Sequence, residues 1–102
     1  MSTSPPNTSQ QRILALILHL FGDVVGGYAP GALAKALETT PSNITRDLAN
    51  LAHAGLAEKV PATGHWRLTS RLPNQAAKVF AQVAARAREA EALSNQFTRH
   101  LS

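Results

Sequence analysis

A short run of polar side chains between residues 42 and 50 has the chemistry to read the edges of nucleic-acid bases. Asn43 can pair with adenine through two hydrogen bonds, Ser42 can donate or accept at several bases, and the guanidinium fork of Arg46 matches a guanine or a phosphate. Ala49, beside Arg46 on a helix, is small enough to let a nucleic acid approach closely. We therefore predict base or backbone contacts from one set of residues: Ser42, Asn43, Thr45, Arg46 and Asn50.

These side chains need a helix to present them, and the sequence predicts one from Pro41 to Ala54. Thr40 is a good N-cap, and proline suits the first helical position because its missing N–H would have no partner there. At about 100° per residue, the apolar positions fall on one face, while Ser42, Arg46, Ala49, Asn50 and His53 fall on the other. The alternative interpretation is an ordinary solvated helix face, with Arg46 paired to a neighbouring carboxylate.

A two-stranded hairpin is predicted after this helix. Gly55 can take the left-handed conformation that ends a helix, residues 56–60 form a short alternating strand, and Thr63-Gly64 is a plausible turn. In the returning strand, residues 65–69, Trp66 and Leu68 are expected to face the core. Four side chains of the hairpin are predicted to contact phosphates, unless it is only a polar hairpin: Lys59, Thr63, His65 and Arg67.

Two further helices precede this unit. Residues 10–21 are strongly apolar and are expected to be capped by Thr8 or Ser9, and a short helix should begin at Pro30 and stop near Glu38. Only a short turn separates this second helix from the third, as in a helix-turn-helix. The predicted fold class is mainly α with a small β-hairpin, a winged helix-turn-helix plus a long C-terminal helix. The expected domains are a disordered tail over residues 1–9, a DNA-binding domain over residues 10–72 and a dimerisation helix over residues 73–102.

The order of these elements resembles the N-terminal DNA-binding domain of the IclR family of bacterial transcription regulators. The resemblance covers residues 10–72, and two passages carry it: Leu48 through Leu56, and the ending Trp66-Arg67-Leu68-Thr69-Ser70-Arg71-Leu72, which is similar to the family's Y-R-L-T-x-R-L. It implies that the third helix enters the major groove and that the wing touches the backbone or the minor groove. The family continues with a large effector-binding domain, whereas about 30 residues follow here, so no small-molecule ligand is expected.

The last segment, from Pro73 to Ser102, has the spacing of a coiled coil. Apolar or small residues recur at alternating intervals of four and three, with mostly charged or amide residues between them. We predict a long helix that pairs with the same helix of a second subunit, the alternative being that it folds back on its own domain. The predicted dimerisation residues are Ala76, Phe80, Val83, Ala87, Ala90, Phe97 and Leu101, with Ser94 as a polar member of the same seam.

Composition narrows the class of function. Ten Lys and Arg against six Asp and Glu give a net charge of +4, which favours an acidic partner such as nucleic acid. On the third helix and the wing, Arg46, Lys59, Arg67 and Arg71 outnumber Asp47 and Glu58 only modestly, and Arg12 is a candidate to flank the DNA backbone. There is no cysteine, no basic-then-apolar leader and no apolar run long enough to cross a bilayer, so a cytoplasmic protein is expected.

No catalytic or metal-binding pattern is present in the sequence. His19, His53, His65 and His100 are scattered without ligand spacing, and Gly26-Gly27 lacks the context of a phosphate-binding loop. We expect no enzyme activity, no metal and no cofactor. The sequence therefore predicts a dimeric, sequence-specific regulator of transcription that binds double-stranded DNA and acts as a repressor. The alternative is a winged-helix adaptor or assembly factor that binds a protein and does not bind DNA specifically.

Overall fold

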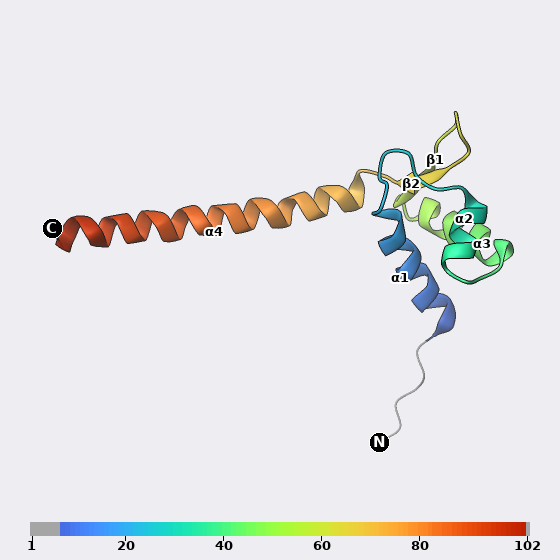
Figure 1. Cartoon of the computed structure of the whole chain (residues 1–102), viewed down its shortest axis with the longest axis horizontal. Helices are drawn as coiled ribbons and strands as arrows, with labels where there is room; N and C mark the ends of the chain where they lie inside the picture. Colours follow the sequence, from blue (N-terminus) through green and yellow to red (C-terminus); the bar gives the residue numbers. More distant parts are fainter. Residues whose placement is uncertain (1–6, 102) are drawn as a thin grey trace, which may run out of the picture. The chain divides into compact units, whose positions relative to one another are not determined.

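The computed structural model describes residues 7–101, with side chains described up to residue 99 (Figure 1). The described residues form two compact units, divided between Arg71 and Leu72. The elements in chain order are α1 (Thr8–Leu20), α2 (Pro30–Ala36), α3 (Pro41–His53), β1 (Ala57–Lys59), β2 (Trp66–Leu68) and α4 (Arg71–Leu101). The tail predicted for residues 1–9 lies mostly outside the described residues.

The start of α1 differs from the prediction. The N-cap is Asn7, neither Thr8 nor Ser9, and its side-chain oxygen accepts a hydrogen bond of 3.1 Å from the backbone N–H of Gln10. Asparagine is among the best N-cap residues, so Thr8 and Ser9 become the first turn of the helix. The helix therefore begins two residues earlier than the sequence predicted.

The limits of α3 follow the local signals in the sequence. Thr40 is the N-cap, its hydroxyl oxygen accepts a hydrogen bond of 3.2 Å from the backbone N–H of Asn43, and Pro41 opens the helix. At the other end Gly55 has a φ of 76°, the left-handed conformation expected of it. The guanidinium of Arg71 donates to the carbonyl of Ala54 at 3.0 Å and so satisfies one of the orphan carbonyls at this helix end.

The core of the first unit lies between the three short helices and the hairpin. The largest fully buried side chains come from all three helices, and Leu68 of β2 closes the core from the hairpin side. Burying one leucine or isoleucine contributes about 1.5–3 kcal/mol, so this small set supplies much of the hydrophobic stabilisation of the unit. The five side chains are Leu16, Leu20, Leu33, Ile44 and Leu48.

The hairpin is antiparallel, and one residue outside it forms an isolated bridge to its second strand. Ala57 pairs with Leu68 and Lys59 with Trp66, which shortens both predicted strands by one residue at each end. Tyr28, in the connection between α1 and α2, exchanges two backbone hydrogen bonds with Trp66, of 2.9 and 2.8 Å. Leu68 is buried and Trp66 is half-buried, and the sequence did not predict the pairing with Tyr28.

The predicted fold class is confirmed. Helices α2 and α3 with the turn between them form the helix-turn-helix, β1 and β2 form the wing, and α4 is the long C-terminal helix (Figure 1). The architecture is a winged helix-turn-helix.

We predict that Gly27→Ala destabilises the protein and that Gly31→Ala does not. Gly27 has a φ of 72°, and a Cβ there would overlap the backbone carbonyl of Trp66. The loss should exceed the roughly 1–2 kcal/mol that the left-handed conformation alone costs. Gly31, in the first turn of α2, has open space around it, so alanine should be neutral or slightly stabilising. Urea unfolding of both variants checks this, and equal losses would contradict it.

Stability should also depend on Asp23 at acid pH. Its carboxylate accepts hydrogen bonds from the backbone N–H groups of Gly26, at 2.8 Å, and Val25, at 3.1 Å, which lower the pKa of Asp23 below its ordinary value of 3.8. A lowered folded-state pKa stabilises the protein above the unfolded-state value, and this contribution is lost as the pH falls through the folded-state pKa. Asp23→Asn should therefore lower stability at neutral pH and flatten its acid dependence. Thermal unfolding between pH 7 and about pH 3 measures both, and an unchanged pH slope would contradict the prediction.

Candidate nucleic-acid interface

The outward face of α3 is exposed and polar. Its inward face is formed by Ile44, Asp47, Leu48 and Leu51, all of which are buried. Ala49 and His53 also lie on this exposed face. The helix brings four of the five predicted contact residues together on it: Ser42, Thr45, Arg46 and Asn50. Ala49 adds no bulk to this face, so a ligand can approach the helix closely.

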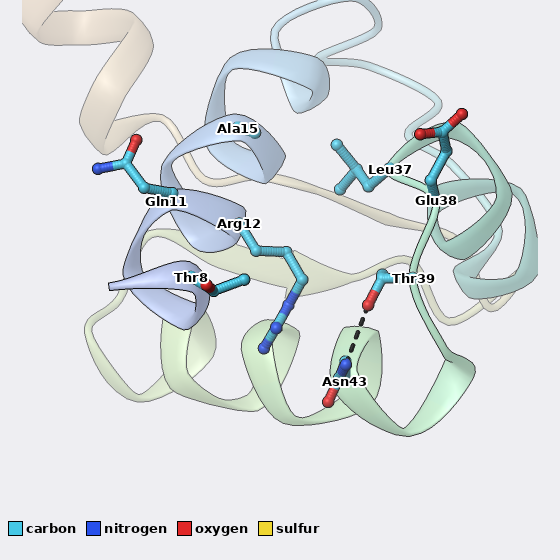
Figure 2. A pocket seen from close by; sticks show the side chains of 8 residues that line it. All are labelled: Thr8, Gln11, Arg12, Ala15, Leu37, Glu38, Thr39 and Asn43. Atoms are coloured by element: carbon cyan, nitrogen blue, oxygen red, sulfur yellow. Dashed lines mark hydrogen bonds between the residues drawn. The ribbon is translucent and has the colours of Figure 1, made fainter. Parts of the chain in front are cut away.

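Asn43 is different from the other four. It is half-buried, and its side-chain N–H donates a hydrogen bond of 3.0 Å to the hydroxyl of Thr39 (Figure 2). This bond uses one of the two amide hydrogens and holds the side chain toward the turn between α2 and α3. Asn43 therefore lies at the margin of the exposed face, with its carbonyl oxygen as the group left to accept.

Thr45 is exposed but restricted in its chemistry. Its hydroxyl donates to the carbonyl of Pro41 at 2.9 Å, within the same helix. A hydroxyl has a single hydrogen to donate, so this side chain can still accept a hydrogen bond from a ligand but cannot donate one without breaking its own. Among the predicted contact residues of this face, Ser42, Arg46 and Asn50 have donors that no internal hydrogen bond uses.

The sequence interpretation counted Asp47 among the exposed charges of α3, and this was wrong because Asp47 is buried. It is 3% exposed and binds Arg12 of α1 through two hydrogen bonds, from Nε at 2.6 Å and from Nη2 at 2.9 Å. The bond to the carboxylate raises the pKa of Arg12 above its ordinary value. Arg12 is thus held in an ion pair within the protein, with its side chain 14% exposed, and its role beside a DNA backbone stays a prediction. The outward face of α3 carries Arg46 and no carboxylate.

Arg12 borders two hollows in the surface. The larger, of about 390 Å³, is bordered by α1 and by the turn between α2 and α3 (Figure 2). The smaller, of about 270 Å³, joins Arg46 and Asn50 of α3 to Ser9 and Gln10 in the first turn of α1. Ser9 and Gln10 extend the polar surface beyond α3, and neither was among the contact residues predicted from the sequence.

The wing residues divide into two groups. Lys59 and Thr63 are exposed, and the hydroxyl oxygen of Thr63 accepts from the backbone N–H of His65, which is half-buried. Arg67 lies away from the hairpin tip and has internal partners, the carboxylate of Glu58 at 3.1 Å and the carbonyl of Val25 at 2.9 Å. It ties β2 to β1 and to the connection before α2.

Several charged side chains of α3 and the wing already have partners within the protein. Asp47 is neutralised by Arg12, Glu58 is paired with Arg67, and Arg71 binds the end of α3. Arg46 and Lys59 carry positive charge without an ion pair among the residues that the structure describes. The interface is basic but only weakly so.

Within residues 7–101, no group of three acidic or histidine side chains is arranged to hold a metal ion. None of the helices in that range is both long and apolar enough to cross a membrane.

Comparison with solved structures gave two alignments. The Zα domain of ORF112 from Cyprinid Herpesvirus 3, described in its binding mode to Z-DNA, aligns with a TM-score of 0.52 at 22% identity, over 64% of this chain and 100% of that one. A variant of ZitR from Lactococcus lactis aligns with a TM-score of 0.48 at 18% identity, over 87% of this chain and 62% of that one. No protein-family model and no curated protein matches the sequence.

The pair between Arg12 and Asp47 should be important for stability. Asp47→Ala leaves a guanidinium without its partner beside a buried position, so we expect it to lower the urea midpoint clearly more than Glu58→Ala, whose carboxylate is 47% exposed. The double variant Arg12→Met, Asp47→Leu removes both charges and should recover most of the loss. Equal effects of the two single variants would contradict a structural role for the pair.

Proposed function

We propose that the protein is a double-stranded DNA-binding regulator of transcription that contacts DNA through the outward face of α3 and through the wing. The observation that carries the proposal is the exposed face of α3, which presents Arg46, Ser42 and Asn50. The one acidic residue of this helix is buried on the opposite face against Arg12. A carboxylate on this face would repel phosphates, and its burial removes that repulsion.

The dimensions and chemistry of α3 suit the major groove. The groove is about 12 Å wide and admits an α-helix, and the small Ala49 allows close approach. Arg46 can bind guanine with two hydrogen bonds, and Asn50 can bind adenine in the same manner. Lys59 on the wing supplies a phosphate contact that carries no sequence information.

The finer parts of the proposal depend on the IclR-like motif and on the fold. The ending from Trp66 to Leu72 supports a bacterial regulator, repressor-like and cytoplasmic, and the Zα domain with a similar fold is described in its binding mode to Z-DNA. Asn43, His65 and Arg67 remain proposed contacts at the edges of the surface. Because a single interface has few free cations, we propose that the protein acts as a homodimer with two interfaces.

Selection from a pool of random duplexes, followed by a salt titration on the selected sequence, tests this function. We expect an enriched motif and an affinity that falls steeply as salt rises, because each phosphate contact releases counterions. A duplex of alternating guanine and cytosine, held in the left-handed form, should be included as a probe. Failure to enrich any motif, together with no retention of either duplex form at low salt, would contradict the proposal.

Arg46→Ala should weaken binding to the selected duplex by roughly 1–3 kcal/mol and relax the preference at one base position. Arg88→Ala, which removes the same charge from α4, is the matched control and should leave the preference unchanged. Lys59→Ala should instead weaken binding to all duplexes similarly. Fluorescence anisotropy with the selected and a scrambled duplex measures each effect, and equal losses for Arg46→Ala and Arg88→Ala would exclude Arg46 as a base contact.

One observation favours the second candidate, a protein-binding adaptor. Leu14 and Leu18 of α1 are 53% and 73% exposed and lie one helical turn apart, with Phe21 continuing the row. An exposed apolar row of this kind is suited to packing against another protein. Loss of DNA binding in the selection experiment would make this face the principal candidate site.

A further inference from the structure

Helix α4 has a wide apolar face that no other described residue of its own unit covers. Five large apolar side chains on it are between 56% and 76% exposed, and at about 100° per residue all of them fall within a sector of about 140°. A helix with so much apolar surface on one side needs a partner to remove it from water. The five are Val79, Phe80, Val83, Leu93 and Phe97.

The pattern along α4 assigns each residue a heptad position. Alternating steps of four and three place Phe80, Ala87 and Ser94 at a, and the remaining seam residues at d: Ala76, Val83, Ala90 and Phe97. Leu101 continues the pattern as an a position, but it lies outside the residues whose side chains the structure describes. The 31 residues of α4 give a helix about 46 Å long, enough for four heptads.

The positions that flank the seam indicate how the two helices are oriented. In the g positions stand Val79, Arg86 and Leu93, and in the following e positions stand Ala84, Glu91 and Thr98. In a parallel coiled coil each g residue faces the e residue five places later in the other helix. Arg86, the one charged g residue of residues 76–99, would thus face Glu91 of the partner subunit, the one charged e residue of that range.

An antiparallel pair would not use these charges. It sets g against g and e against e, so Arg86 and Glu91 would lie on opposite sides of the coil. Within the described part of a single chain, neither Arg86 nor Glu91 takes part in an ion pair. The charge pattern therefore favours one orientation and one register.

We propose that α4 pairs with α4 of a second copy as a parallel, in-register two-stranded coiled coil, closed by two ion pairs between Arg86 and Glu91 of the partner subunit. The inference rests on the homodimer of the proposed function and defines its interface. A parallel pair joins both winged units to the same end of the coil. Two copies of α3 can then address one duplex, with half-sites about 34 Å apart or a multiple of that distance.

The absence of cysteine from the chain permits a direct test with Ser94→Cys in the full-length protein. In the parallel coil this a position lies opposite itself, whereas an antiparallel coil with the same seam sets it opposite Val83, about 16 Å along the helix from the partner's thiol. We expect mild oxidation to link most of Ser94→Cys into a covalent dimer, and the outer-face control Ala92→Cys to remain largely unlinked. Equal linking of the two variants, or linking only when Ser94→Cys is mixed with Val83→Cys, would overturn the proposal.

Charge reversal tests the register independently. By sedimentation equilibrium the full chain should be a dimer, and Arg86→Glu or Glu91→Arg should raise the dimer Kd about tenfold, because each change affects two pairs. Combining both reversals should restore association, and Arg88→Glu on the outer face should have little effect. A monomeric full chain, a larger oligomer, or a double variant no better than the singles would overturn the proposal.

These measurements contain no DNA, so their outcome is separate from that of the proposed function. A linked dimer that retains no duplex would reject DNA binding and leave the coiled coil in place. A monomer that binds duplex would reject the coiled coil alone.

Discussion

The ion pair between Arg12 and Asp47 is the interaction on which the arrangement of the candidate interface depends. It joins α1 to α3 across 35 residues of sequence, with both side chains largely shielded from water. A charge in such a position is costly unless its partner is in place, so the pair constrains how α3 can be rotated about its own axis. In the observed rotation the carboxylate of Asp47 faces inward, and Arg46, the preceding residue in the chain, faces outward.

The same constraint explains why the interface is basic without being strongly charged. Two acidic residues near it are each held by an arginine, Asp47 by Arg12 and Glu58 by Arg67, so their charges cancel in pairs. Arg46 and Lys59 supply most of the remaining positive charge. A surface with so few free cations gains much from being present twice, because a second linked contact binds at a high effective concentration. The wide apolar face of α4 fits such an arrangement.

The sequence predicted those features that are determined by neighbouring residues. Thr40, Pro41 and Gly55 act through hydrogen bonds and dihedral angles within a turn of themselves, so the limits of α3 could be predicted closely. The predicted start of α1 was wrong because Asn7, and neither Thr8 nor Ser9, is the N-cap. The N-cap propensities of these three residue types are too similar to decide between them.

Long-range partners could not be predicted. Nothing local distinguishes Asp47 from an ordinary exposed acid on a helix, and its position near the polar side of the sequence pattern gave the wrong assignment. The pairing of Tyr28 with Trp66 likewise joins backbone groups 38 residues apart, and no pattern of side chains in the sequence indicates it. Which of the predicted contact residues are free to act therefore became clear only from the structure, as the internal bonds of Asn43 and Arg67 illustrate.

An NMR titration of the isotope-labelled full chain with duplex DNA tests the central claim most directly, because it reports each residue separately. The account predicts that the largest shifts occur at Ser42, Arg46 and Asn50 of α3 and at Lys59 of the wing, and that they shrink as salt is added. Shifts concentrated on Leu14 and Leu18 of α1, or no shifts at low salt, would contradict the claim that the outward face of α3 binds DNA.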